Sequence, residues 1–359
     1  MSNLIDENCP RVTNVNRCLR QSVIMLFASM LGAGAGYALE PDLEVAMKQL
    51  NEQFSTSVII PGYEALGGQM ERLVLATQSF EAEPTEANLA AVRTAWLAAV
   101  SSWTSTNTVA FGPVHSLGYS TALEFPADEA GIDTLLATTA ETEAFDVESL
   151  LPSLQGFEAM AYLLGTANNK TAADFSNQER RYLSALVVRA DGVTTDLLTV
   201  WQTGWNSNPA YGTLLSTAGS PGNHLYLSVE SGSEEIIRSI VNSLEVISAE
   251  ELPDILEASE LLAESPDTTT LQLLSSGIQG IQSAYVGTTA ELGMGVSGLV
   301  AIANPTIDQQ IQSSLVTALN SIDQAISDPT NTVPLFQAQR SVDIAFELLQ
   351  TEILPLVQN

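Results

Sequence analysis

The sequence predicts an all-α protein built of two antiparallel four-helix-bundle-like domains. Apolar residues recur at steps of three and four over several long segments, which is the spacing of one face of an α-helix. No stretch shows the period-two alternation and β-branched enrichment of a strand long enough to build a sheet. Breaks rich in Gly, Pro and Asn separate the helical segments and favour antiparallel packing of neighbours.

Each helix is expected from its own apolar stripe. The first clear stripe begins after Thr85, and Ser176 with Glu179 forms a capping box that opens a later helix. The remaining stripes are shorter or lie nearer the C-terminus. In chain order, the predicted helical segments span residues 89–103, 150–164, 182–201, 234–247, 307–326 and 335–353.

The stretch from Trp205 to Asn223 is dense in Asn, Gly, Ser and Pro and is predicted to be the inter-domain linker. The expected organisation, in order, is a signal peptide at 1–38, an N-terminal bundle at 39–205, a linker at 206–223 and a C-terminal bundle at 224–359.

The N-terminal segment is typical of a secretory signal peptide. Arg17 and Arg20 precede an apolar run at 23–35, and small residues lead to Ala38, after which cleavage is expected. The protein is therefore predicted to be periplasmic or otherwise exported. An uncleaved membrane anchor is the alternative, although so short a run only marginally spans a bilayer. Both cysteines lie in this segment, so the mature chain would have none and would not depend on disulfides.

The charge balance is strongly acidic because basic residues are scarce. The 359 residues include 42 Asp and Glu against 12 Lys and Arg, a formal net charge of −30. Charged residues make up 15% of the chain, against about 25% in an average protein, and the shortfall lies in Lys and Arg. Such a chain repels phosphate backbones and attracts cations, so no nucleic-acid partner is expected.

Most catalytic motifs are missing from the sequence. With only His115 and His224 in the chain, a three-histidine zinc site within one molecule is impossible. There is no His-Glu-x-x-His, Gly-x-Ser-x-Gly or phosphate-loop motif. A metal site would be dominated by carboxylates, which suit ferric iron, calcium or magnesium. His115, which follows Gly112-Pro113, is a candidate ligand-binding residue, with a solvated loop histidine as the alternative.

Several segments together resemble imelysin-like proteins, in the family's order and approximate spacing. The strongest match is the run Gly-Phe-Glu-Ala-Met-Ala-Tyr-Leu-Leu-Gly at 156–165, which resembles the family's signature helix. The other matching segments are Ala95-Trp96, Trp103, Phe111-Gly112-Pro113-Val114, Phe125-Pro126, 132–136, Arg181-Tyr182-Leu183, Trp201, and more weakly 271–285 and the last two helices.

The resemblance implies an exported all-α protein of two bundles, from a family linked to bacterial iron uptake. Some members are classed as metallopeptidases because of a Gly-x-His-x-x-Glu motif, whose His and Glu share one helix face. This chain keeps Gly156 but has Glu158 at the His position and Ala161 at the Glu position. The resemblance therefore leaves Glu158 as the metal-ligand candidate. Arg181, one of the few cations in the chain, is a ligand-binding candidate as a partner of Glu158 or of a substrate anion, with a surface ion pair as the alternative.

The expected function is binding without catalysis: an exported protein that takes a metal ion, a metal complex or haem during iron uptake. Its cofactor or cargo would be iron or another divalent or trivalent cation, and its partner an outer- or inner-membrane uptake component. One alternative is a scaffold or interaction module whose ancestral site has decayed. The other is a metallopeptidase, which would need a held ion, an open water position and a nearby base.

Overall fold

The structure is a computed structural model that describes residues 41–140, 143–165, 170–262, 265–287 and 295–358. Across these ranges the regular structure is helical, without a β-strand, so the predicted all-α class is confirmed. The predicted signal peptide lies outside the described residues. Within them, no helix has both the length and the apolar character needed to cross a membrane.

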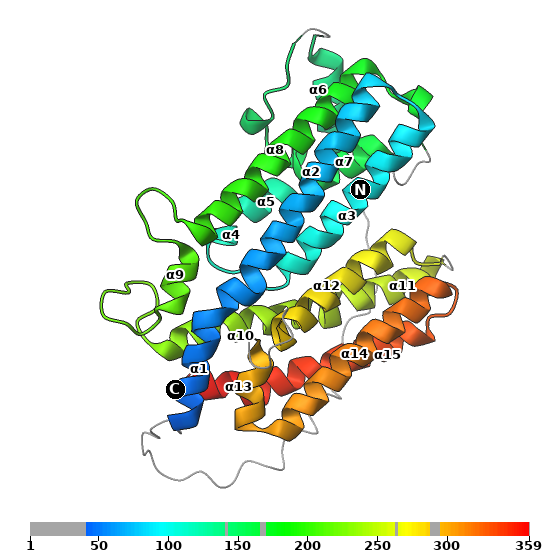
Figure 1. Cartoon of the computed structure of the whole chain (residues 1–359). Coiled ribbons are helices and arrows are strands. Elements are labelled where there is room, and N and C mark those ends of the chain that lie inside the picture. Colours follow the sequence, from blue (N-terminus) through cyan, green and yellow to red (C-terminus); the bar gives the residue numbers. More distant parts are fainter. Residues whose placement is uncertain (1–40, 141–142, 166–169, 263–264, 288–294, 359) are drawn as a thin grey trace, which may run out of the picture. The chain divides into compact units, whose positions relative to one another are not determined.

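The first long helical run is α-helical at both ends and contains a π-helical segment between them. α1 (Pro41–Phe54) passes through the π-helical segment η1 (Ser55–Ile59) into α2 (Ile60–Ala82) without a loop. A short turn leads to α3 (Glu86–Asn107), whose N-terminus is capped by the Thr85 side chain. α8 (Asn177–Gln202) lies beside α2, and its N-terminus carries the predicted Ser176–Glu179 capping box. α2, α3 and α8 form the frame on which the shorter helices of the first half are packed (Figure 1).

Short helices fill the segment between α3 and α8. A helix over 150–164 was expected, but the helix begins only at Gly156, because Pro152 and the positive φ of Gly156 interrupt the preceding backbone. The short elements are α4 (Pro113–Ser116), α5 (Tyr119–Glu124), α6 (Glu129–Thr138), η2 (Val147–Ser149), η3 (Pro152–Leu154), α7 (Gly156–Leu164) and η4 (Ala172–Asp174).

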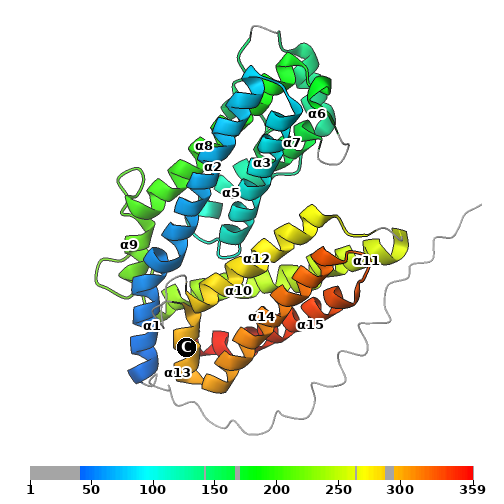
Figure 2. The same ribbon diagram turned by 45° about the vertical axis from the view of Figure 1, so that its right-hand side comes forward.

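The second half of the chain forms its own set of packed helices. α14 pairs along its length with α15 and also packs on α12, as Figures 1 and 2 both show. The elements after α8 are α9 (Tyr211–Ser216), α10 (Val229–Val246), η5 (Ile247–Glu251), α11 (Leu252–Leu262), α12 (Thr268–Val286), α13 (Val296–Ala303), α14 (Pro305–Ser327), α15 (Val333–Leu348), η6 (Leu349–Ile353) and η7 (Leu354–Val357).

Residues 40–359 form one compact unit in which the two sets of helices touch. α3 packs against α12, where a Cβ on Gly280 would lie 2.0 Å from the carbonyl oxygen of Ser105, so only glycine permits this approach. α1 packs against α9, α10 and α13. The stretch 206–223 contains α9, whose Tyr211 is buried. The division into two bundles at this stretch remains a prediction.

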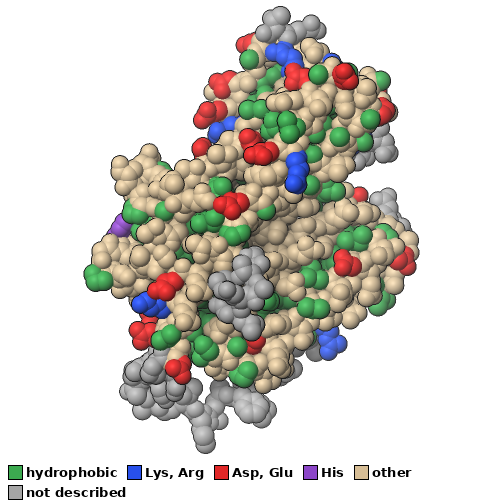
Figure 3. Space-filling model, viewed as in Figure 1, with side chains coloured by type: hydrophobic (Ala, Val, Ile, Leu, Met, Phe, Trp, Pro, Cys, Tyr) green, Lys and Arg blue, Asp and Glu red, His purple; other side chains and the backbone are tan. Residues whose placement is uncertain are grey.

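The predicted apolar stripes form the core. Leu89, Val92, Trp96, Val100 and Trp103 are all buried along α3. Trp201 of α8 is also buried, in contact with the rings of Phe111 and Tyr211. The surface is sparsely charged, and Figure 3 shows carboxylates scattered over one face with few basic side chains between them.

Candidate functional site

Glu158, the metal-ligand candidate, lies on the exposed side of α7. It sits in the first turn of that helix, while its neighbours Phe157, Ala159 and Met160 are buried. Among the described residues, no group of three or more His, Cys, Asp or Glu side chains is arranged to hold a metal ion. The metal-binding role of Glu158 therefore remains a prediction.

The motif glycine has a steric role in placing this helix. Gly156 has a φ of +78°, and a Cβ there would lie 2.5 Å from the carbonyl oxygen of Leu123 at the end of α5. An L-residue is strained at this backbone angle and would also collide with α5. Gly156 thus lets the start of α7 pack directly against the segment that carries Glu124.

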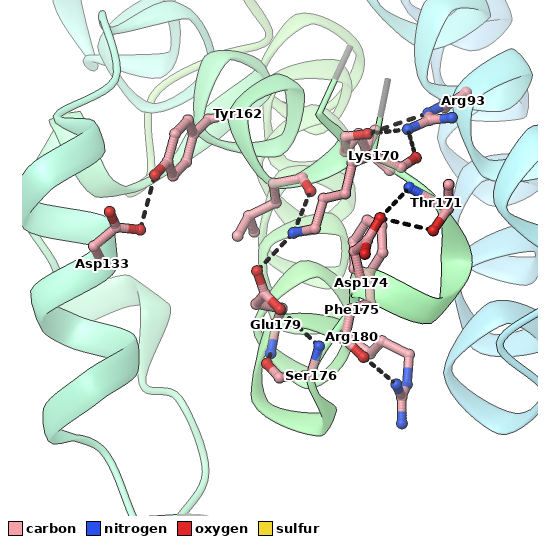
Figure 4. Close-up of polar contacts among 12 residues, drawn as sticks. Arg93, Asp133, Tyr162, Lys170, Thr171, Asp174, Phe175, Ser176, Glu179 and Arg180 are labelled. Carbon is pink, nitrogen blue, oxygen red and sulfur yellow. Dashed lines mark hydrogen bonds and ion pairs between the residues drawn. The ribbon is translucent and has the colours of Figure 1, made fainter. Parts of the chain in front are cut away.

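The other end of α7 is held by two basic side chains (Figure 4). Arg93 donates two hydrogen bonds to the carbonyl oxygen of Leu164, at 3.1 and 2.6 Å, and one to that of Lys170 at 2.6 Å. The Nζ of Lys170 donates to the Leu163 carbonyl at 3.3 Å and pairs with Glu179 at 2.6 Å. Cations at a helix C-terminus complement its dipole and satisfy its free carbonyls. These contacts fix the signature helix and give Lys170 and Arg93 structural roles.

Arg181 lines a cavity that does not include Glu158. Its Nη2 donates a hydrogen bond to the carbonyl oxygen of Glu143 at 2.7 Å. It lines a cavity of about 520 Å³ together with Phe145, Glu148 and Arg189. Glu158 is not among the described residues of that lining, so the structure does not place the two candidates in one site.

His115 lines a different cavity, of about 380 Å³, which we call the polar pocket. Its walls come from the end of α3, from α4 and α5, and from α10, η5 and α12. The lining residues are Thr104, Asn107, Thr108, Ala110, His115, Glu124, Ser239, Asn242, Ser243, Val246, Ile247, Glu251 and Gly277. The volume is within the range typical of small-molecule sites. Neither Glu158 nor Arg181 lines it, whereas Glu124 and Glu251, which the sequence did not single out, both do.

Glu124 is held in the polar pocket by two side chains of α3. Its Oε2 accepts hydrogen bonds from Nε1 of Trp103 at 3.0 Å and Nδ2 of Asn107 at 2.8 Å. The Oδ1 of Asn107 is buried and has no hydrogen-bond partner among the described residues. Partial burial of the carboxylate raises the pKa of Glu124, and the bonds from Trp103 and Asn107 and the nearby His115 oppose that rise without cancelling it. Part of the residue's surface remains exposed, so the carboxyl group is accessible from the pocket.

Glu251 reaches the same pocket from the other half of the chain. It is the last residue of the π-helical segment η5, and Ile247, the first residue of that segment, also lines the pocket. Burial raises the pKa of Glu251, and repulsion from Glu250 adds to the effect. π-helical segments are frequently found at functional sites.

Two further contacts define the pocket. The Oγ of Ser243 on α10 donates a hydrogen bond to the carbonyl oxygen of Thr108 at 2.7 Å, which ties α10 to the end of α3. The Nδ1 of His115 lies 3.3 Å from Oγ of Ser120, and the ring is exposed. His115 is therefore an exposed side chain of the short helix α4 that lies at the pocket, and not the loop histidine that the sequence suggested.

The pocket presents mainly hydrogen-bond acceptors. Among the described residues that line it there is no Lys or Arg, while two carboxyl groups, an imidazole, two amides and several hydroxyl groups are present. Both carboxyl-bearing residues remain exposed to solvent, and without a Lys or Arg in the lining their negative charge attracts cations to the pocket. The only sequence signal for Glu124 was its place directly before Phe125-Pro126, and no local pattern marked Glu251.

The match to a known family settles which proteins this chain resembles. The family model described as imelysin, of the peptidase M75 class, matches residues 59–351. The chain belongs to the imelysin family.

The relatives match this chain over most of its length. Iron-regulated protein A of Synechococcus elongatus is 28% identical over 323 residues, covering 86% of each chain. The solved structure of a putative iron-regulated protein A precursor from Parabacteroides distasonis is similar with a TM-score of 0.70 and 19% identity, over 89% of this chain and 96% of that one. An imelysin-like protein from Psychrobacter arcticum gives 0.69 and 14%, over 89% and 98%. These two likenesses show a common fold.

Proposed function

We propose that this imelysin-family protein is an exported, non-catalytic binding protein for iron acquisition, and that its ligand, a metal complex or haem, binds in the polar pocket. The observation that carries the proposal is the convergence of His115, Glu124 and Glu251 on one cavity from separate parts of the chain. The family match, and the name of the Synechococcus relative, support a link to iron. Export rests on the signal-like N-terminal segment, and delivery would need an uptake component in the outer or inner membrane.

The donor set supports a metal complex better than a bare ion or a peptidase centre. A zinc or iron ion held directly by protein needs several ligands at close to 2 Å. The described residues offer no group of three such ligands. Metal-assisted peptide hydrolysis needs such a held ion with an open water position. A complex that brings its own ligands needs only a cavity with suitable polar contacts.

The test is a calorimetric titration of the protein with ferric citrate, haemin, and copper, zinc and calcium salts, combined with elemental analysis. Glu124→Gln removes a pocket carboxylate, and Glu158→Gln removes the same charge from an exposed position outside the pocket. Stoichiometric binding that is lost in Glu124→Gln and kept in Glu158→Gln supports the proposal. Binding lost only in Glu158→Gln would place the site on the signature helix. No binding at all would favour a scaffold with a decayed site.

Export has a separate test. N-terminal sequencing of the protein recovered from a bacterial periplasm should begin at Leu39 if the signal peptide is cleaved after Ala38. Recovery of the intact chain in the membrane fraction would favour the uncleaved anchor.

A further inference from the structure

We propose that two copies of this chain associate through the exposed face of α15. In the pair, α15 of one copy packs antiparallel on α15 of the other, and Arg340 of each copy pairs with Glu347 of its partner. The surface is separate from the polar pocket, whose described lining includes no residue of α14 or α15. The proposal therefore goes beyond the ligand-binding function and does not depend on it.

A groove of about 610 Å³ lies between α14 and α15, which pack side by side (Figures 1 and 2). Its large apolar side chains are open to solvent: Val333 is 68% exposed, Phe336 is 48% exposed, and Ile344 is exposed as well. The α14 side of the described lining contributes only uncharged residues, among them Ser313 and Thr317. Apolar side chains that are gathered in one exposed groove, and not scattered singly, are typical of an interaction surface.

The exposed residues of α15 share one side of the helix along its whole length. They recur at steps of three and four, which places their side chains in one narrow sector of the helix surface. From the N-terminus to the C-terminus of α15 they are Val333, Phe336, Gln337, Arg340, Ile344 and Glu347. We call these six residues the α15 face. The α15 face thus combines three apolar side chains with one positive and one negative charge.

Arg340 has no partner within the described part of its own chain. It is the only Lys or Arg that follows Arg238 in the sequence. Among the described residues, its guanidinium forms no ion pair and no hydrogen bond, and the same holds for the carboxylate of Glu347. An Arg guanidinium and a carboxylate form strong, charge-assisted hydrogen bonds when they meet. Both groups are therefore available to a second molecule.

The spacing of the two charges makes the α15 face complementary to itself. Arg340 and Glu347 are seven residues apart, which is two helical turns or roughly 10 Å along the axis. A two-fold axis that crosses α15 near Ile344 would place Arg340 of each copy opposite the partner's Glu347, so the same ion pair would form twice. A parallel arrangement in register would instead place Arg340 against Arg340. The charge pattern therefore selects the antiparallel arrangement.

The net charge of the protein also favours this face over other surfaces. Each copy has a formal net charge of −30, so two copies repel each other at low ionic strength. The two charges of the α15 face cancel, and the α14 side of the described groove lining is uncharged. Contact through this face adds no pair of like charges, and salt screens the repulsion between the remaining surfaces.

The test is sedimentation equilibrium of the full chain over a range of protein concentrations, in about 0.5 M sodium chloride to screen the overall repulsion. The variants are Arg340→Glu, Glu347→Arg, the double charge swap that combines them, and Phe336→Ala. Arg72→Glu on α2 is the charge control, because it changes the net charge as Arg340→Glu does but lies outside the α15 face. Leu75→Ala is the control for Phe336→Ala, because Leu75 is an apolar residue of α2 that is 64% exposed.

We expect a reversible dimer. Its dissociation constant should rise at least tenfold in Arg340→Glu and in Glu347→Arg, since each change places like charges opposite each other at both symmetric contacts. The double charge swap should return the constant to within about threefold of wild type, because it restores both ion pairs with their signs exchanged. Phe336→Ala should weaken the dimer, whereas Arg72→Glu and Leu75→Ala should not.

Four results would overturn the inference. A wild-type chain that stays monomeric at every concentration would leave the α15 face to a different protein. A dimer that none of the α15 variants weakens would use another surface. Equal weakening by Arg340→Glu and Arg72→Glu would show a general effect of net charge. Weakening by both single charge changes without recovery in the double swap would exclude the reciprocal Arg340–Glu347 pairing. Circular dichroism of each variant would confirm that a loss of association is not a loss of folding.

Discussion

The indole Nε1 of Trp103 donates a hydrogen bond to Oε2 of Glu124 over 3.0 Å, and so joins the core of the protein to its polar pocket. Trp103 belongs to the apolar stripe of α3, and its side chain is buried. Its polar edge nevertheless reaches the pocket, as is common for an indole, because a buried N–H needs an acceptor. The same contact orients a carboxyl group that the apolar pattern of the sequence could not identify.

Replacement of Glu124 by Gln should make stability less dependent on pH. Because burial raises the pKa of Glu124, the folded protein holds this proton to a higher pH than the unfolded chain does. Its contribution to stability is therefore complete below the unfolded pKa and is lost as pH rises through the folded pKa. Gln keeps an acceptor for Trp103 and Asn107 but carries no charge. The melting temperature of Glu124→Gln, relative to wild type, should rise between about pH 4 and pH 7.

The control for this experiment is Glu179, whose pKa shift has the opposite sign. Burial alone would raise the pKa of Glu179, but hydrogen bonds from Lys170 and Ser176 outweigh it and lower the pKa. Glu179→Gln should therefore lose stability relative to wild type above the unfolded pKa, and that difference should disappear as pH falls through the folded pKa. The same pH trend in both variants would contradict the assignment.

Loss of the Lys170 ammonium should loosen the C-terminal end of α7. Lys170→Met removes a partly buried ion pair with Glu179, the bond to the Leu163 carbonyl and a contact 4.0 Å above the ring of Phe175. Hydrogen bonds to charged groups contribute about 1.5–3 kcal/mol, so we expect a loss of about 2 kcal/mol in the free energy of unfolding by urea. Lys48→Met is the control, because Lys48 makes only an exposed pair with Glu52 at 3.9 Å and should change stability by less than about 0.5 kcal/mol. Equal effects of the two changes would argue against the role of Lys170.

The close approach of α3 and α12 depends on Gly280. In Gly280→Ala the new methyl group would lie 2.0 Å from the Ser105 carbonyl oxygen and 2.5 Å from Oγ1 of Thr108, so the helices must move apart. Overpacking of this kind costs roughly 1–3 kcal/mol, and the change should also disturb the pocket, which Thr108 lines. Gly192→Ala is the matched control, since the new methyl group would meet no atom within 4 Å beyond its chain neighbours and the nearby backbone of its own helix, and a helical Gly→Ala change should stabilise by about 0.5–1 kcal/mol. Chemical denaturation measures both; two stabilising changes would show that α3 and α12 do not approach so closely.

Salt should stabilise the protein. With 42 acidic against 12 basic residues, repulsion among carboxylates destabilises the folded state at low ionic strength, and added salt screens it. Differential scanning calorimetry should show the melting temperature rising between roughly 10 mM and 0.5 M sodium chloride. A flat or falling melting temperature would show that the negative charges are compensated locally.

Local patterns in the sequence determined the fold class, the main helices and the family. Spacing along each helix predicts the apolar stripe of α3 and the capping box at Ser176, and the structure confirms both. The tryptophans of these helices, Trp96, Trp103 and Trp201, are buried. The resemblance to imelysin-like proteins rested on ordered short segments and is likewise confirmed. Helical periodicity and capping act over a few residues, which is why a sequence read along its length reveals them.

Only the tertiary structure decided which polar side chains share a site. Glu158 stood at the informative motif position but lies on the exposed side of α7, whereas Glu124 and Glu251 carried no motif and line one pocket. Helical spacing states which residues share a face, but it does not state which faces of distant helices meet. That pairing depends on contacts between segments far apart in sequence, on the backbone freedom of Gly156 and Gly280, and on the π-helical turn that ends at Glu251.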